Sequence, residues 1–194
     1  VNADDSATSL EADEAAGVME AGMRLIGRQI YYGRNSGKGD SRGHFGLQDF
    51  VDNSMLYNAT GTAANTGSSV YFVKFGIKDV QLVFGKNSVL ALPPFREESI
   101  LDTNGNSYDG WVSHLTGWQG LQCTNPTSVV RVCNLTAEAG KGLTDAILAR
   151  ALDLFPTGVT PDAIFMSKRS RTQLREDRSA KMALRGDGRA GSVG

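Results

Sequence analysis

One amphipathic segment near the start of the chain constrains the fold more than any other feature. Its apolar residues recur at offsets of four, three and four, and they are Met19, Met23, Ile26 and Ile30. This spacing places all four on one face of an α-helix. Thr8 to Glu11 has the form of a capping box, so we expect the helix to begin there, and Gly33 is placed to end it.

Three glycines, Gly17, Gly22 and Gly27, lie inside the same segment. Each costs about 1 kcal/mol relative to alanine in a helix interior. We therefore expect another backbone segment to approach the helix closely at these positions.

A glycine-rich loop follows the helix. Residues 33–46 contain five glycines and Lys38, which suggests either a phosphate-binding loop or a surface connection. A Walker-type loop opens a helix and has Ser or Thr after its lysine, whereas here Gly39 takes that place and the segment follows a helix. We therefore predict a solvent-exposed connection, after which Phe45 and Leu47 anchor the chain on the core.

The sequence pattern changes from helical to alternating after the polar residues 58–69. Residues 70–75 are mostly β-branched or aromatic, as in strands. Val80, Leu82 and Phe84 alternate with other residues, so they lie on one face of a second strand. This region is therefore predicted to be β-structure.

A hairpin is predicted further along by Asn104-Gly105, between residues 95–101 and 108–123. Pro93-Pro94 interrupts the preceding element, so that strand lies at an edge or starts after the prolines. Together the strands predict an antiparallel meander of four or five members.

A helical period returns near residue 143. Its apolar positions are Leu143, Ile147, Ala151 and Leu154. Pro156 and Gly158 close this helix. Residues 163–166 form an apolar run of strand length, and Ser167 can cap a following helix whose one clear apolar position is Leu174.

This order of elements predicts an α+β fold, without the rhythm of a parallel sheet and without an internal repeat. We divide the chain into three parts. They are residues 1–50 with the first helix and the glycine-rich loop, residues 51–137 with an inserted antiparallel β region, and residues 138–194 with a helix-strand-helix unit.

The composition is that of a globular chain, with 194 residues of which 40% are hydrophobic and 21% charged. No apolar run approaches the roughly 18 residues that span a bilayer, and no signal peptide pattern is present. Cys123 and Cys133 are too few for a disulfide scaffold, and two histidines supply no zinc site. We expect both cysteines to be small buried hydrophobes, with a disulfide as the alternative.

Charge is distributed unevenly. Residues 1–20 contain six acidic residues and no basic one, whereas residues 168–194 contain eight basic and three acidic residues. Such a split can steer one subunit onto another, bring basic groups to a polyanion, or simply solvate two terminal segments. The sequence leaves these three alternatives open.

No catalytic constellation is apparent. His44 and His114 are the only imidazoles, and neither has a local Ser or Cys signature of nucleophilic catalysis. We expect His114 to be a structural histidine within a strand. No catalytic, cofactor-binding or metal-binding residue is therefore predicted.

The segment Asp102 to Asp109 has the oxygen-rich spacing of the front of a calcium loop. Ser113 stands where a bidentate Glu would close such a site, so a hairpin tip is favoured. An alternative function remains, a carbohydrate- or ligand-binding β module that uses this loop with Trp111 and Trp118. The two tryptophans lie seven residues apart, on opposite faces of one extended strand, which is poor geometry for a stacking platform.

Several phrases in a fixed order resemble one known family, the tailed-phage major capsid proteins of the Hong Kong 97 type. The phrases are residues 22–33, Phe45-Gly46-Leu47, and residues 69–76, 102–111, 117–121, 129–135, 145–154 and 164–169. The resemblance is greatest to the branch from short-tailed phages with an inserted strand region. Two departures are that Arg34 precedes Asn35, and that no residue separates Phe45 from Gly46.

The resemblance implies a Hong Kong 97-like fold, with a long spine helix, an inserted β region and part of an axial domain that meets its neighbours around five- and six-fold axes. The family's N-terminal arm and extended loop have no counterpart in this sequence, and the axial domain is incomplete at the C-terminus. The chain begins with Val1 and ends in a glycine-rich phrase. We therefore expect a central fragment, either a processed product or an excerpt.

The resemblance also implies a function. It is that of a virion structural protein, without catalysis or cofactor, that self-assembles into an icosahedral shell enclosing double-stranded DNA. The implied partners are further copies in pentamers and hexamers, a scaffold protein, and packaged DNA contacted without sequence preference, with no membrane. The implied location is the capsid of the virion, assembled in the host cytoplasm.

Overall fold

A computed structural model describes residues 7–35, 37–64, 66–86 and 90–187 of the chain. Asp4, Asp5 and Arg189, which contribute to the charged ends, lie outside these residues. The chain forms two compact units, each built from two segments. Unit 1 comprises Val1–His44 and Leu82–Gly120, and unit 2 comprises Phe45–Gln81 and Leu121–Gly194. The sequence-based division at residues 50 and 137 stays a prediction.

Unit 1 begins with the long helix α1, Ala7–Tyr32. Gly33 ends it with a φ of 55°, a conformation that glycine adopts without strain, and its N–H donates to the carbonyl of Gln29 at 2.9 Å. The predicted helix and its end are therefore confirmed. The predicted start is wrong, because α1 already includes Ala7 and Thr8 lies inside it.

The helical glycines bear out the prediction of close approach only in part. A Cβ at Gly22 would collide with the side chain of Leu115, so this position has a packing reason to be glycine. At Gly17 and Gly27 a Cβ would meet nothing within 4 Å. The neighbour at Gly22 is a side chain and not a backbone segment.

Two small sheets continue from the second segment of unit 1. Strand β3 (Val80–Phe84) pairs with β6 (Gln119–Cys123), and β4 (Arg96–Leu101) pairs with β5 (Ser107–Val112). The β4–β5 hairpin turns at Asn104-Gly105, where Gly105 has a φ of 86°. The predicted hairpin is thus confirmed, although its second strand ends at Val112 and pairing resumes only at β6.

Unit 2 is built on a four-stranded sheet in the order β1-β7-β2-β8. Its strands are β1 (Leu56–Asn58), β2 (Ser68–Val73), β7 (Val129–Leu135) and β8 (Ala163–Phe165). The β1–β7 pair is parallel, and β2 is antiparallel to both β7 and β8. Short helical turns, α2 (Leu47–Phe50), η1 (Asn53–Met55) and η2 (Pro126–Ser128), lie in the connections.

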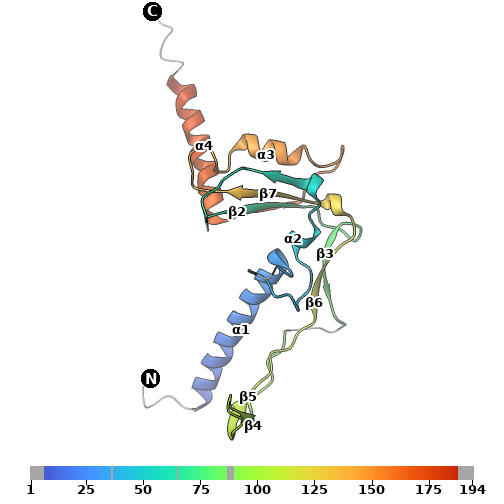
Figure 1. Cartoon of the computed structure of the whole chain (residues 1–194), viewed down its shortest axis with the longest axis vertical. Helices are drawn as coiled ribbons and strands as arrows, with labels where there is room; N and C mark the ends of the chain where they lie inside the picture. The colour runs from blue at the N-terminus through green and yellow to red at the C-terminus, as the bar shows by residue number, and fades with distance from the viewer. Residues whose placement is uncertain (1–6, 36, 65, 87–89, 188–194) are drawn as a thin grey trace, which may run out of the picture. The chain divides into compact units, whose positions relative to one another are not determined.

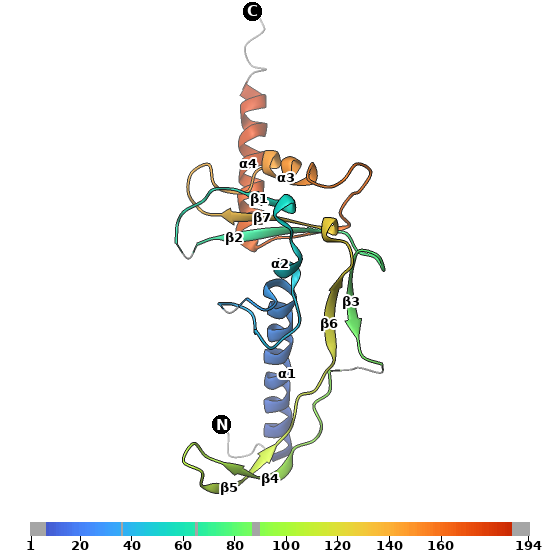
Figure 2. The same cartoon turned by 45° about the vertical axis from the view of Figure 1, so that its right-hand side comes forward.

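Helices α3 (Asp145–Leu152) and α4 (Lys168–Asp187) lie on one side of this sheet (Figures 1 and 2). The hydroxyl of Thr144 caps α3 by accepting from the N–H of Ile147, and the hydroxyl of Ser167 accepts from the N–H of Ser170 at the start of α4. The core lies between these helices and the sheet, and its buried residues are Met55, Ala59, Val70, Phe72, Val130, Val132, Leu135, Leu143, Ala151, Phe155 and Leu174. The helix-strand-helix order and the buried position of Leu174 confirm the sequence-based prediction.

The α+β class is confirmed, but the meander is wrong. The strands are nested, with β2 pairing with β7, β3 with β6 and β4 with β5. The physical reason is burial: most of β2 and β7 is buried, so both need neighbours and cover at the centre of a sheet, whereas β3 is exposed beyond Val80 and Gln81. Leu82 and Phe84, predicted to share a packed face with Val80, are 47% and 59% exposed.

Candidate functional site

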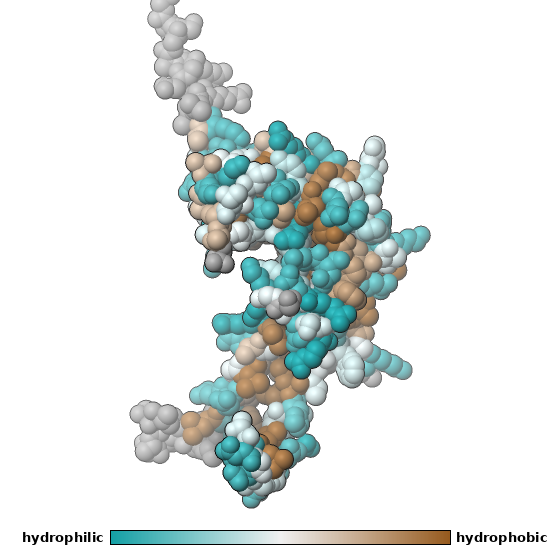
Figure 3. Space-filling model, in the orientation of Figure 1, coloured by the Kyte–Doolittle hydropathy of each residue, from teal (hydrophilic) through white to brown (hydrophobic). Residues whose placement is uncertain are grey.

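Unit 1 exposes its apolar side chains. Among its described residues, the structure buries only Gln29 and Gly33, so no hydrophobic side chain described in this unit is buried. Met23, Phe84, Trp111 and Trp118 are each more than half exposed. Figure 3 shows hydrophobic surface over the part of the chain that Figure 1 labels α1, β3 and β6. A unit that buries so little apolar surface gains little stability by itself, and such exposed patches mark interaction surfaces.

An apolar groove lies within unit 1, between α1 and the segments that flank β3 and β6. It has a volume of about 320 Å³, and its lining residues are Met23, Ile26, Gly27, Phe84, Leu90, Gly117, Trp118 and Gln119. Gly27 leaves space beside the helix, since a Cβ there would meet no atom within 4 Å. The predicted apolar face of α1 therefore lines an open groove instead of a core.

The glycine-rich loop is organised by Gln29, a buried polar residue that is only 8% exposed. Its Nε2 donates to the carbonyl oxygens of Asp40, at 3.2 Å, and His44, at 2.7 Å. Its Oε1 accepts from the N–H of Asp40 at 2.9 Å. Gly43 must lack a side chain here, because a Cβ would overlap the Gln29 amide. The loop glycines thus serve backbone geometry, as predicted for a connection.

The residues after this loop fulfil half of their prediction. Leu47 is 3% exposed and anchors the chain, whereas Phe45 is 51% exposed and contacts the ring of Phe50 at a centroid distance of 6.0 Å. Phe45 is therefore not a buried anchor. Sequence reasoning missed Gln29 altogether, and the only signal for it was a polar residue beside Ile30 on the inner side of the helix.

One group of basic residues on α4 has partners within unit 2. Arg169 Nη2 donates to the carbonyl oxygen of Leu135 at 3.0 Å. Arg178 and Lys181 pair with acidic residues, as described below. These side chains fasten α4 to the rest of the unit.

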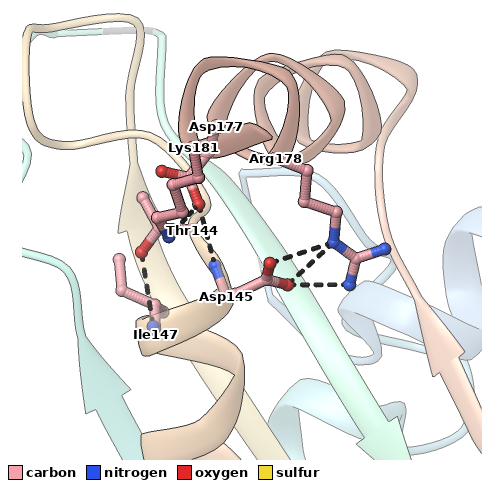
Figure 4. A network of polar contacts seen from close by, with 6 residues as sticks. All are labelled: Thr144, Asp145, Ile147, Asp177, Arg178 and Lys181. Carbon is pink, nitrogen blue, oxygen red and sulfur yellow. Dashed lines mark hydrogen bonds and ion pairs between the residues drawn. The ribbon is translucent and has the colours of Figure 1, made fainter. Parts of the chain in front are cut away.

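Asp145 and Asp177 receive two of these basic side chains (Figure 4). The Asp145 carboxylate accepts from Arg178 Nε, at 2.9 and 3.0 Å, and from Nη2 at 2.7 Å. Asp177 Oδ2 lies 2.6 Å from Lys181 Nζ and also accepts from the N–H of Asp145 at 3.3 Å. Hydrogen bonds from Arg178 and Lys181 hold the pKa values of Asp145 and Asp177 below their ordinary range. The network fixes the start of α3 against α4.

Three other basic residues of α4 remain available. Lys168, Arg171 and Arg175 have exposed side chains, and within the described part of the chain none of these side chains has a hydrogen-bond or ion-pair partner. Because they are three and four residues apart, they share one face of the helix. We call these three residues the basic stripe.

The Asp102–Asp109 segment is a hairpin tip, as the sequence favoured. The carboxylate of Asp102 accepts from the N–H groups of Asn104 and Asn106, both at 2.8 Å, and from the Asn106 side-chain amide at 3.1 Å. The bonds from Asn106 lead those that hold the pKa of Asp102 below its usual value. These bonds turn the backbone. Among the described residues, no group of three His, Cys, Asp or Glu side chains is arranged to hold a metal ion.

The two tryptophans do not line a common surface. Trp118 lines the apolar groove, whereas Trp111 lies on β5 and is not among the groove residues. In the part of the chain that the structure describes, no feature favours the alternative ligand-binding function.

His114 lies between β5 and β6 and not within a strand, so its predicted position is wrong. Its Nε2 is 3.7 Å from Glu98 Oε2, and both side chains are partly exposed. His44 contributes its backbone carbonyl to the Gln29 network. The two imidazoles thus sit in different local settings, one beside a carboxylate and one at the end of the glycine-rich loop.

Cys133 is buried and Cys123 is half-buried, and both are free thiols. Burial raises the pKa of the Cys123 thiol. The prediction of a buried small side chain is confirmed for Cys133. None of the described helices has the length and apolar content needed to cross a membrane.

A known protein family matches most of the chain. The sequence model of the family described as major capsid protein GP7 matches residues 5–186, which includes both units almost entirely. No curated protein matches it. The chain therefore belongs to the major capsid protein GP7 family.

Proposed function

We propose that the chain is a major capsid subunit that self-assembles, without catalysis, into an icosahedral shell around double-stranded DNA. Membership of the family makes it a structural component of a virion shell that contains many copies. The icosahedral symmetry, the pentamers and hexamers, and a Hong Kong 97-like fold are part of the proposal. They are supported by the long helix α1, by the mixed α+β architecture and by the order of the capsid-like phrases in the sequence.

The observation that carries this proposal is the contrast between the two units. Unit 2 has a buried core, whereas the described residues of unit 1 bury no hydrophobic side chain. Burial contributes about 25 cal/mol for each Å² of apolar surface, so contacts that cover unit 1 would stabilise it substantially. Neighbouring copies in a shell are the natural source of such contacts.

Electron microscopy of the full-length protein tests this proposal directly. We expect closed shells when the protein is expressed at high concentration, alone or with a scaffold protein from the same genome. The host cytoplasm is the proposed place of assembly. Monodisperse monomers at every salt concentration, with and without scaffold, would contradict self-assembly.

The basic stripe supports a second element of the proposal, non-specific contact with packaged DNA. Its three charges are exposed and unpaired among the described residues, unlike those of Arg169, Arg178 and Lys181, which are used within unit 2. Contacts to phosphates require positive charge but no base-specific geometry. A helix face with three such basic side chains has that chemistry.

The salt dependence of DNA binding tests this contact. Each phosphate bound contributes about −0.9 to the slope of log K against log salt. Replacement of Lys168, Arg171 and Arg175 by alanine is expected to flatten the slope in proportion to the number of phosphates that these side chains neutralise. Replacement of the exposed Lys78 and Lys86 is the control, and an equal effect of both variants would contradict a role of the stripe.

A further inference from the structure

The hairpin of β4 and β5 presents one aromatic side chain within a polar face. Trp111 pairs with Glu97 and Asp109 pairs with Ser99, so these four side chains share one face of the hairpin. Trp111 is 62% exposed. The described residues contain no ion-pair partner for Glu97 or Asp109. This face, which we call the Trp111 face, is a single large apolar side chain with acidic neighbours.

The apolar groove of unit 1 has the complementary character. Its volume of about 320 Å³ is at the lower end of the roughly 300–1,000 Å³ of ligand pockets, so it suits one large side chain. Met23, Phe84 and Trp118 supply apolar walls, and Gly27 leaves the floor open. Trp111 of the same chain is not among the lining residues, so the groove is open to another occupant.

The charges beside the groove are basic. Lys86 follows Phe84 by two residues, and its exposed side chain has no ion-pair partner among the described residues. Arg28 is adjacent to Gly27 on α1, and its Nη2 donates to the carbonyl oxygen of Lys38 at 2.8 Å. Because that acceptor is neutral, the charge of Arg28 is not compensated by it. The groove and the Trp111 face thus match in both polarity and sign of charge.

We propose that the Trp111 face of one copy binds the apolar groove of a second copy. This inference rests on the proposed self-assembly and names one contact within it. The contact is heterologous, since it joins two different surfaces, and repeated contacts of this kind close into rings when the rotation allows. Tryptophan is a frequent energetic centre of interfaces, and Glu97 and Asp109 would face Lys86 and Arg28 around it.

Crosslinking between two single-cysteine variants tests the contact. One variant carries Trp111→Cys and the other Met23→Cys, both with Cys123→Ser, while the buried Cys133 is kept. The two proteins are mixed, brought to assembly conditions and treated with a short bis-maleimide. Because each reactive cysteine is on a different copy, a product of twice the chain mass reports an intermolecular contact.

Tyr108→Cys is the matched control for Trp111→Cys. Tyr108 pairs with Ile100 and lies on the opposite face of the same hairpin, and it is 54% exposed. We expect the dimer band with Trp111→Cys and only background with Tyr108→Cys. Equal yields from the two positions would overturn the proposal.

Filling the groove provides a second test that does not depend on loss of folding. Gly27→Leu, added to the Met23→Cys protein, places a side chain in open space and favours the helix. We expect the crosslink to disappear while the helical circular dichroism is kept or increased. An unchanged crosslink yield would contradict the groove as the binding site.

The outcomes separate this inference from the proposed function. Shells without the Trp111–Met23 crosslink would leave self-assembly intact and refute this contact. The crosslink in protein that forms no shells would support the contact and contradict shell formation. Absence of both shells and crosslink would refute both.

Discussion

Gln29 is expected to control the stability of the glycine-rich loop. Gln29→Ala removes three hydrogen bonds, two donated to the carbonyls of Asp40 and His44 and one accepted from the N–H of Asp40. A hydrogen bond contributes about 1 kcal/mol net, so the loop should lose about 3 kcal/mol against local opening. At 1.4 kcal/mol for each factor of ten, this is a change of about 100-fold in the opening equilibrium.

Hydrogen exchange measures this change at one amide. The N–H of Asp40 is protected by Gln29 Oε1, so its exchange rate should rise by about 100-fold in Gln29→Ala. Arg28→Ala is the matched control, because it removes one exposed hydrogen bond, to the Lys38 carbonyl, from the adjacent helical position. Its effect on Asp40 should be much smaller.

Gly43→Ala tests the same network from the other side. A Cβ at Gly43 would overlap the Gln29 amide, so the side chain must move away from the loop. Faster exchange at Asp40 is again expected. If neither Gln29→Ala nor Gly43→Ala exceeds the Arg28→Ala control, the reasoning that Gln29 holds the loop is refuted.

Three further predictions concern stability. Hydrogen bonds from Thr136 and then Thr62 lower the pKa of Glu138 from 4.5 to about 2, so the stabilisation from this group is complete above about pH 4.5 and is lost as the pH falls toward about 2. Urea unfolding at several pH values should show a smaller loss on acidification in Glu138→Gln than in the wild type, and parallel curves would contradict this role. Leu143→Ala, at a position 1% exposed, should cost about 2–5 kcal/mol in urea unfolding, whereas Leu152→Ala, at 41% exposed, should cost much less; similar costs would count against the described core. Gly105→Ala should destabilise the β4–β5 hairpin because of its φ of 86°, seen as faster amide exchange in β4 and β5, while Gly120→Ala should leave that hairpin unchanged.

Local elements could be predicted where a residue acts through its own backbone or its immediate period. The helical spacing from Met19 to Ile30 and the position of Gly33 located α1, and Asn104-Gly105 located the β4–β5 hairpin. Ser167 located the start of α4. These signals depend on neighbours only a few residues away.

Strand pairing could not be predicted in the same way. Val73 of β2 pairs with Val129 of β7, and no local pattern identifies a partner so distant in the sequence. Alternation in β3 also gave no measure of burial, since Leu82 and Phe84 alternate correctly but are exposed. Their exposure is consistent with a surface completed by other copies, which a single sequence does not reveal.

The candidate surfaces show the same division. The basic content of α4 was visible in the sequence, but which basic residues are free was not. Arg178 is used by Asp145, 33 residues earlier in the chain, whereas Arg175 is unpaired among the described residues. Likewise, the type and position of Gln29 gave little sign that its amide binds the backbone of a later loop.

The nested pairing of strands has a consequence for how such proteins diversify. Val73 and Val129 are neighbours across the β2–β7 ladder, so residues 74–128 leave the sheet and return to it at almost the same place. A segment whose two ends are fixed side by side can gain or lose length with little effect on the sheet that holds it, because the entropy of closing a loop grows only slowly with its length. Evolution could therefore resize or replace this excursion, and with it the surface offered to neighbours, while the sheet of unit 2 is preserved.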